Sequence, residues 1–402
     1  MQTLITPQRL SSFEKMTSKN IKSRLFNFFT DQTLQPSHEE YLDLNKAIQT
    51  GDVPMDKVMA WVMTNPRQNR KLFETALYKG LDKLPHEVPE LTEFFNLVEK
   101  KPMWLDPVKV ETAIKFTHRL GSNGTFILRD LALMTGYQYP GFNQPLIITG
   151  ALSKYAGKRL AETHKWWLDV NKPNSFDRFN DGFTSTIFVR FIHSLVRYQL
   201  NKSKEWDYEV WGEPINQYDQ AMTNLAFSSV LLLGVRAIGI FPSKAESEAM
   251  IHFWKYAGWL MGVDEKWLVN KESEAWKLLM WMDYAHPKVD ESSRALANGL
   301  ANEPFERHYK HFNSFLQKKA YQNHLDITQL FLGPKKMKNL GLKPRVLAWY
   351  PFYLMAKNGV IYNGAKHIGI LDRYLQKHGR ADQEFSLELY QNAGKQLASM
   401  HQ

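Results

Sequence analysis

Residues 183–200 read FTSTIFVRFIHSLVRYQL, and apolar side chains recur in this stretch at the three- and four-residue intervals of an α-helix. Arg190, His193 and Arg197 stand at positions i, i+3 and i+7, so these basic side chains share one stripe. Burial favours the neutral form of an imidazole, which is the form that binds a metal ion. We therefore predict a buried helix with His193 as a candidate metal ligand.

The two arginines beside His193 allow two interpretations. A guanidinium group forms paired hydrogen bonds with a carboxylate, so Arg190 and Arg197 are candidates for binding the propionate groups of a haem. In the alternative, His193 is an ordinary core histidine bonded to a backbone carbonyl, and both arginines form salt bridges within the protein.

Helical periodicity with capping residues extends through most of the chain, whereas the alternating pattern of β-strands is scarce. One predicted helix begins after the capping residue Asp106, with Pro107 at its first position. Another begins after Ser243, which is spaced to form a capping box with Glu246. The predicted fold class is all-α, a large helical bundle in which residues 225–241 form a buried helix.

The length of 402 residues suits one large or two moderate domains. The first 50 residues are more polar than the rest, so we expect residues 1–50 to form a helical appendage and residues 51–402 to form the main domain. Clusters of Pro, Gly and Asn predict connections between helices, for example at residues 139–145 and 333–344.

Cysteine is absent, which excludes disulfides, iron–sulfur clusters and thiolate-bound haem. Common catalytic motifs such as GxSxG, GxGxxG and HExxH are also missing. The N-terminal residues lack an apolar core of signal-peptide length, and no stretch is apolar enough to span a bilayer. We therefore expect a cytoplasmic protein whose iron, if any, has nitrogen or oxygen ligands.

The formal net charge of +10 raises the question of an anionic partner. Lys and Arg are scattered along the chain, and their densest cluster is Lys335, Lys336 and Lys338. No zinc-finger spacing or aromatic RNA-binding motif accompanies them, so nucleic acid is not an expected partner. We interpret the cluster as a solvated loop, with peripheral membrane contact as the alternative.

A second helix is predicted at residues 157–170, GKRLAETHKWWLDV, where Arg159, Glu162 and Thr163 share one face. A buried Glu162 would transfer protons, and Arg159 would hold it or stabilise a developing oxyanion. The alternative is a solvated face on which Arg159 pairs with Glu162 at low energy. In the segment GEPINQYDQAMT that begins at Gly212, Asn216, Gln217 and Asp219 suit helix capping as well as they suit a site.

These stretches together resemble a known family. The pair Arg159 and Thr163, then VRFIHSLVR, GEPINQYDQAMT and FWKYAGWLMGV, follow the order and spacing of the latex-clearing rubber oxygenases and their MpaB relatives. The resemblance covers about residues 119–265.

The resemblance implies an all-α bundle with globin-like packing of its core helices around a b-type haem. It implies that His193 is the proximal iron ligand, and that Arg159 and Thr163 lie on the distal side. Glu162 stands where rubber oxygenases have a lysine that binds the iron, so an acid–base role for Glu162 is the more economical hypothesis.

The function expected from this resemblance is a haem b-dependent oxygenase. It would act with dioxygen on an apolar, alkene-containing small molecule, by oxygen insertion or by oxidative cleavage of the double bond. Two alternatives remain: a non-catalytic haem- or lipid-binding helical protein, and a helical protein without cofactor that docks on anionic membranes.

Overall fold

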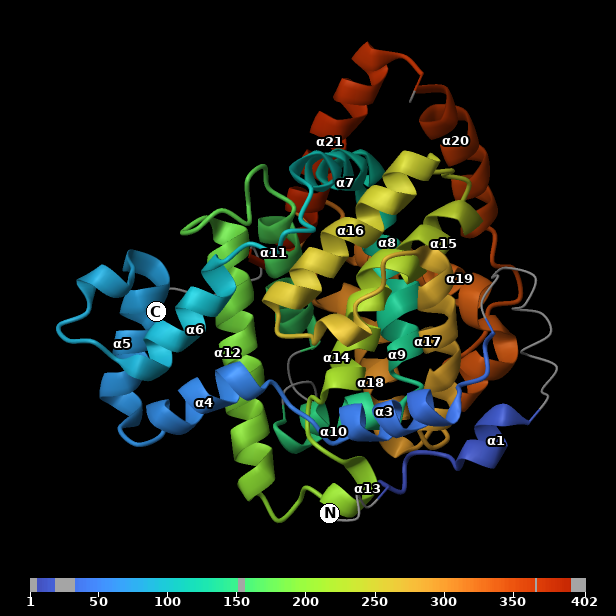
Figure 1. Ribbon diagram of the computed structural model, residues 1–402. Helices are drawn as coiled ribbons and strands as arrows, with labels where there is room; N and C mark the ends of the chain where they lie inside the picture. The colour runs from blue at the N-terminus through green and yellow to red at the C-terminus, as the bar shows by residue number, and fades with distance from the viewer. Residues whose placement is uncertain (1–5, 19–32, 151–155, 366, 392–402) are drawn as a thin grey trace. The chain divides into compact units, whose positions relative to one another are not determined.

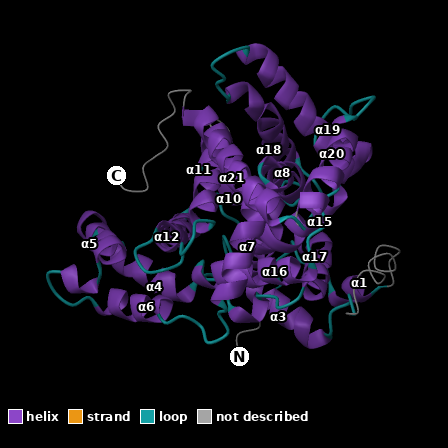
Figure 2. Ribbon diagram, turned by 90° about the horizontal axis from the view of Figure 1, so that it is seen from above, coloured by secondary structure: helices purple, strands orange, loops and turns teal. Residues whose placement is uncertain are grey.

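The computed structural model describes residues 6–18, 33–150, 156–365 and 367–391. These residues form helices joined by loops, and none of them lies in a β-strand (Figure 1, Figure 2). The predicted all-α fold class is confirmed.

The chain divides into two compact units, each made of three segments. Unit 1 comprises Met1–Pro107, Asp169–Asn224 and His252–Ala285, and unit 2 comprises Val108–Leu168, Leu225–Ile251 and His286–Gln402. The described residues among the first 50, for which we expected a helical appendage, are grouped with the first unit.

Unit 1 has the long helix α12 (Asp181–Lys202) at its centre, packed against α4 (Val53–Val62) and α5 (Pro66–Lys79). Phe191 of α12 stacks on Phe73 of α5, with 4.4 Å between ring centroids. The other elements of this unit are α1 (Phe13–Thr17), α3 (His38–Ile48), η1 (Leu81–Lys83), α6 (Pro89–Glu99), α13 (Tyr208–Trp211), α14 (Gln217–Leu225, of which Leu225 is assigned to unit 2), η4 (Glu265–Trp267) and α17 (Glu272–Ala285).

Unit 2 has an apolar core that includes Met134, Leu296, Leu300, Leu325 and Met337. These side chains come from helices α9 (Met134–Gly136), α18 (Glu291–Asn302) and α19 (Asn313–Asn339). The other elements are α7 (Pro107–Leu120, of which Pro107 is assigned to unit 1), α8 (Ser122–Ile127), η2 (Leu128–Leu133), α10 (Pro140–Ile148), η3 (Ala226–Val230), α15 (Leu231–Ala237), η5 (Glu303–Glu306), α20 (Tyr350–Ala365) and α21 (Gly369–Gln391). Two further helices, α11 (Ala156–Val170) and α16 (Lys244–Leu260), have residues in both units.

Helix boundaries that depend on capping chemistry agree with the sequence-based predictions. Helix α7 begins at Pro107, as predicted. At the start of α16, the backbone N–H of Glu246 donates to Ser243 Oγ at 3.2 Å, and the N–H of Ser243 donates to Glu246 Oε2 at 2.7 Å. The predicted capping box is therefore present.

Two predicted connections differ from the structure. Residues 139–145 were expected to be a loop, but Pro140 occupies the first turn of α10, where a missing N–H costs nothing. Within residues 333–344, Gly333 interrupts α19 with a φ of 73° and a ψ of 162°, helix then continues to Asn339, and only residues 340–344 form the expected connection. Proline and glycine therefore marked a helix start and a kink at these two places.

Among the described helices, none combines the length and apolar character needed to cross a bilayer.

We predict that Gly234→Ala destabilises the protein. A Cβ at Gly234 of α15 would lie 2.3 Å from Ile127 Cγ2 and 3.0 Å from Leu131 Cδ2, so the packed helices would have to separate. Overpacking of this kind costs about 1–3 kcal/mol. Chemical denaturation measures it, with Gly136→Ala as the matched control, because a Cβ there meets nothing within 4 Å. Equal stability of the two variants would contradict the prediction.

Candidate functional site

His193 lies on a half-buried stripe of α12. The stripe also contains Val189, four residues before the histidine, Ile192, one residue before it, and Val196, three residues after it. The Nδ1 atom of His193 is shielded from solvent. The opposite side of α12 is buried and packs on α5 through Phe191. The helix therefore presents an imidazole among partly exposed aliphatic side chains.

Both arginines beside His193 are buried in ion pairs with the start of α4. Arg190 binds Asp52 through Nε at 2.5 Å and Nη2 at 2.7 Å, and its Nη1 donates to the carbonyl of Leu260 at 3.0 Å. Arg197 binds Asp56 through Nε and Nη2, and Ser194 Oγ donates to the same carboxylate at 2.5 Å. The salt-bridged alternative therefore describes these two side chains, and the structure does not place them for propionate groups.

Two glycines make this arrangement fit. A Cβ at Gly262 would lie 2.6 Å from Arg190 Nε, and a Cβ at Gly51 would lie 2.6 Å from Arg197 Nε. The backbone approaches each guanidinium so closely that a larger residue would displace it.

The polar side chains around Asn216 form hydrogen bonds and an ion pair within the fold. Asn216 Oδ1 accepts a hydrogen bond from the backbone N–H of Asp219 at 2.9 Å, which caps α14. Asp219 forms a buried bidentate pair with Arg9 at 2.7 and 2.8 Å. Gln217 Nε2 donates to the carbonyls of Gly51 and Gly262 at 2.9 Å each. Capping and loop-to-loop bridging therefore account for these polar residues.

The residues predicted on the second helix lie on α11, in unit 2. Arg159 Nη1 is 3.5 Å from Glu162 Oε2, with 44% of the arginine side chain and 25% of the glutamate side chain exposed. Thr163 is exposed. The geometry matches the alternative of a solvated face, on which such a pair contributes little to stability. Glu162 is thus reachable from solvent rather than enclosed.

Unit 2 also contains a buried charge cluster that the sequence analysis did not identify. Arg129 binds Asp130 and Glu303, and Arg307 binds Glu303 at 2.8 and 2.9 Å. His324 completes the cluster, because its Nδ1 lies 2.6 Å from Asp130 Oδ2. The available signal was the pair Arg129–Asp130 inside the otherwise apolar run FILRDLALM, but nothing in the sequence indicated its partners.

The hydrogen bonds of this cluster determine the tautomer of His324. Arg307 Nη2 lies 2.8 Å from His324 Nε2, and a guanidinium group can only donate. Nε2 must therefore accept, so the ring proton is on Nδ1 and is donated to Asp130. Burial, together with Arg129 and Arg307, holds the pKa of His324 well below its usual value. With His324 neutral, two arginines balance two carboxylates.

The two carboxylates respond differently to burial. Burial raises the pKa of Asp130 to about 7, although Arg129 acts in the opposite direction. Burial would also raise the pKa of Glu303, but Arg307 and Arg129 outweigh it and hold that pKa at about 2. Asp130 is thus the group of this cluster that titrates nearest to neutrality.

His164, directly after Thr163, is a half-buried histidine of unit 2. Burial lowers the pKa of His164 to about 4, and the charges of Arg307 and Arg380 act in the same direction. Its Nε2 atom is shielded from solvent, and its ring contacts the edge of Trp167 with 5.8 Å between centroids. The imidazole is therefore neutral at physiological pH.

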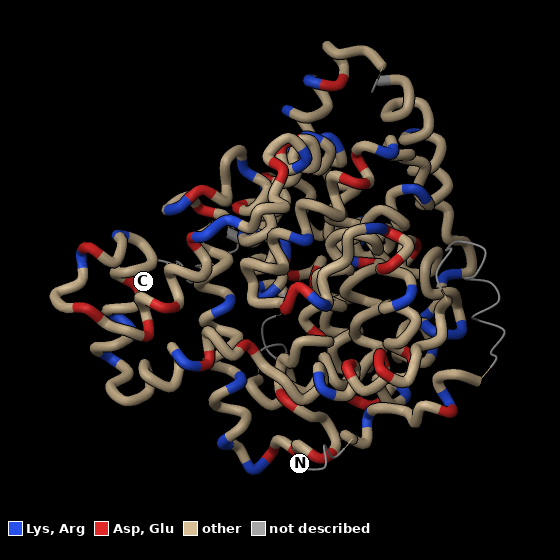
Figure 3. Tube along the Cα trace, viewed as in Figure 1, with Lys and Arg blue, Asp and Glu red and all other residues tan. Residues whose placement is uncertain are grey.

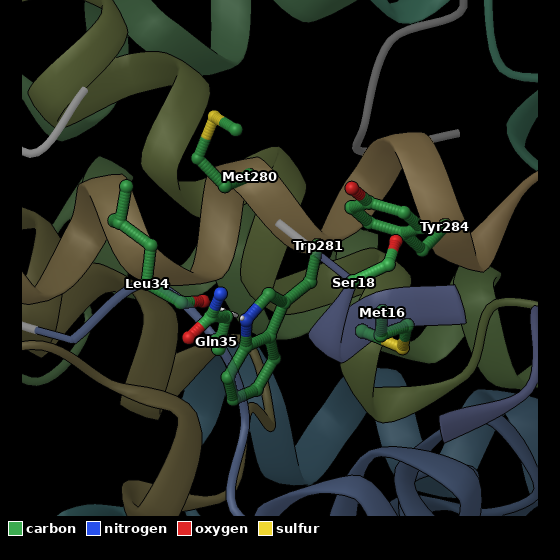
Figure 4. Close-up of a pocket in the computed structure, with 7 residues that line it drawn as sticks. All are labelled: Met16, Ser18, Leu34, Gln35, Met280, Trp281 and Tyr284. Carbon is green, nitrogen blue, oxygen red and sulfur yellow. Dashed lines mark hydrogen bonds between the residues drawn. The ribbon is translucent and has the colours of Figure 1, made fainter. Parts of the chain in front are cut away.

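A cavity in unit 1 lies between α1, the segment that precedes α3, and α17. It is lined by Met16, Leu34, Gln35, Met280 and Trp281, among others (Figure 4). Its volume of about 20 Å³ is room for a single water molecule, so it is not a substrate site.

The fold and these residues define an all-α protein with a histidine-bearing central helix. The family described as "ER-bound oxygenase mpaB/B'/Rubber oxygenase, catalytic domain" matches residues 119–357. Since this match covers more than half of the chain, the chain belongs to that family, and the resemblance stated from the sequence is confirmed.

Two individual proteins show the same likeness. The chain is 22% identical over 199 residues to the rubber oxygenase of Streptomyces sp. (strain K30), a match that spans 46% of either chain. The alignment therefore covers just under half the length of that relative. The structure of latex clearing protein LCP in the closed state superposes with a TM-score of 0.64 and 16% identity, over 83% of this chain and 91% of that one. This likeness shows that the fold is shared.

We predict that Asp52→Asn destabilises the protein by about 3–5 kcal/mol, because it leaves the buried guanidinium of Arg190 without its counter-charge. Chemical denaturation measures the change. Glu93→Gln is the matched control: it breaks an exposed pair with Lys57, which is also on α4, and should cost at most about 1 kcal/mol. An equal loss of stability in the two variants would show that the buried charge of Arg190 does not require Asp52.

We also predict that His164 makes stability depend on pH. Its pKa is about 4 in the folded protein and 6.5 ordinarily, so the unfolded chain binds the proton first as the pH falls. Neutral His164 contributes at most about 3 kcal/mol to the free energy of unfolding. This contribution is complete above pH 6.5 and is lost as the pH falls toward 4. Denaturation at several pH values should show a shallower decline for His164→Gln. The exposed His311→Gln should follow the wild type, and identical slopes for all three proteins would refute the prediction.

Proposed function

We propose that the protein is a haem b-dependent oxygenase that uses dioxygen to oxidise a C=C bond of an apolar substrate. Membership of an oxygenase family supports the reaction class. The name of the similar Streptomyces protein supports a polyisoprene-like hydrocarbon as the substrate class. The observation that carries the proposal is the place of His193, on a half-buried aliphatic stripe of a helix held by two ion pairs.

The residues around His193 fit one part of a haem site and not another. An imidazole among Val189, Ile192 and Val196 would suit a ligand of a haem iron in apolar surroundings. Arg190 and Arg197 do not suit the propionates, because Asp52 and Asp56 already neutralise them. We therefore assign both arginines to positioning: they fix the rotation of α12 on α4, and thereby the direction of the imidazole.

When bound, the haem iron supplies the activation of oxygen. The remaining chemistry belongs to the side chains of α11. Glu162 is held loosely by Arg159 and is reachable by solvent, so its carboxylate is free to accept and return a proton. Thr163 offers a hydroxyl one residue further on. Neutral His164 follows, with its ring fixed against Trp167.

The experiment that tests this function compares haem content and oxygen uptake in the wild type and His193→Ala, both produced with added haem. We expect a Soret band and oxygen uptake with a polyisoprene oligomer for the wild type, and the loss of both in the variant. His118→Ala, which removes another half-buried helical histidine, should retain both. A colourless wild type would refute the proposal, and haem without oxygen uptake would identify a non-catalytic haem binder.

We predict that Glu162→Gln lowers kcat about 100-fold while the haem spectrum is unchanged, because it removes a proton-transferring group and keeps the shape of the side chain. Steady-state oxygen uptake measures the effect. Glu291→Gln is the matched control, since Glu291 forms an exposed pair with Arg294 at the same i, i+3 spacing. Unchanged kcat in Glu162→Gln would exclude the acid–base role.

A further inference from the structure

One side of helix α20 is anchored in unit 2. Leu354 and Asn358 lie on this side and are buried. Asn358 Nδ2 donates to Asn123 Oδ1 at 3.0 Å and to the carbonyl of Ile238 at 2.9 Å. These buried hydrogen bonds determine which face of α20 points outward.

The outward face of α20 is apolar as well. Phe352, Tyr353, Val360 and Ile361 are 66%, 49%, 79% and 38% exposed. They form two adjacent pairs that lie two helical turns apart, and the exposed Lys357 lies one turn from Tyr353 and one turn from Ile361, so all five residues share one side of the helix. A surface helix of a globular protein normally carries polar residues on this side. An exposed strip of this kind marks an interaction surface.

The first turn of the next helix also exposes apolar side chains. Ile370 and Leu371, in the first turn of α21, are 73% and 44% exposed. Figure 1 shows α21 and α20 converging at this end of the unit. We name the six residues Phe352, Tyr353, Val360, Ile361, Ile370 and Leu371 the α20–α21 strip.

The charged residues of the stretch of chain that contains α20 are all positive. No Asp or Glu occurs between Asp326 and Asp372, and Figure 3 accordingly shows no acidic residue on α20. The same interval contains Lys335, Lys336, Lys338, Lys343, Arg345, Lys357 and Lys366. The bounding Asp326 and Asp372 are themselves paired with Arg345 and Arg119. The apolar strip therefore lies in a stretch of chain with excess positive charge.

We infer that the α20–α21 strip docks on an anionic phospholipid bilayer, with α20 lying in the plane of the interface. Exposed aromatic and aliphatic side chains beside lysines have the chemistry of a helix that enters the headgroup region, where anionic lipids attract the lysines. Helix α20 has 16 residues and is therefore about 24 Å long, too short to cross the hydrocarbon core.

A second copy of the chain is a poorer occupant of the same surface. A symmetric contact would bring Lys357 and its neighbouring cations toward their own copies without any carboxylate from the interval to compensate them. Lipid headgroups supply that compensation. The inference goes beyond the oxygenase function and does not depend on it, although a membrane is also where apolar substrates dissolve.

The test is co-sedimentation of the full chain with vesicles of phosphatidylcholine, alone or mixed with phosphatidylglycerol. We expect binding to the anionic vesicles, weakened by added salt. The double variant Val360→Asp/Ile361→Asp should weaken it at least about tenfold, because two charges would have to enter the interface. Lys357→Glu should weaken binding to the anionic vesicles only, by up to about tenfold.

Val108→Asp is the matched control, because Val108 of α7 is 71% exposed and lies outside the strip. It should bind as the wild type does, and circular dichroism should show that all variants are folded. Absence of wild-type binding, or equal binding by the double variant, would overturn the inference. So would a concentration-dependent dimer that the double variant abolishes while vesicle binding is unchanged.

Discussion

The ion pairs between α12 and α4 constrain the rest of unit 1. Arg190 and Arg197 stand two turns apart on α12, and each is buried against a carboxylate at the start of α4. Asp52 also caps α4 by accepting from the backbone N–H of Met55 at 3.4 Å. A buried charge without its partner is strongly unfavourable, so α12 has one acceptable rotation and register against α4. That rotation sets where His193 points.

Buried ion pairs also join the helices of unit 2. Asp130 and Glu303 share Arg129, while His324 and Glu303 share Arg307. These contacts join η2, η5 and α19 through polar groups that are buried except for Arg307, which is 14% exposed. Tyr390 of α21 donates a further hydrogen bond to Glu303. Because the positive and negative charges balance only when His324 is neutral and Asp130 is ionised, the packing of these helices and the protonation states within the cluster depend on one another.

The sequence predicted the helices well where the signals were local. The capping residues Asp106 and Ser243 marked the starts of α7 and α16, because a cap and its helix lie within a few residues of each other. The partners of Arg190 and Arg197 could not be predicted, since Asp52 and Asp56 lie 138 and 141 residues away in the chain. The choice between a buried and a solvated Glu162 stayed open for a related reason: helical spacing shows which residues share a face, but not whether the fold covers that face.

The most direct test of the central claim is a haem titration of the purified full chain, followed at the Soret band. It compares the wild type with His193→Gly, in the absence and presence of imidazole. We predict that the wild type binds haem, that His193→Gly loses the band of histidine-ligated haem, and that added imidazole restores it. A variant that binds haem with the affinity and spectrum of the wild type would show that another residue holds the iron.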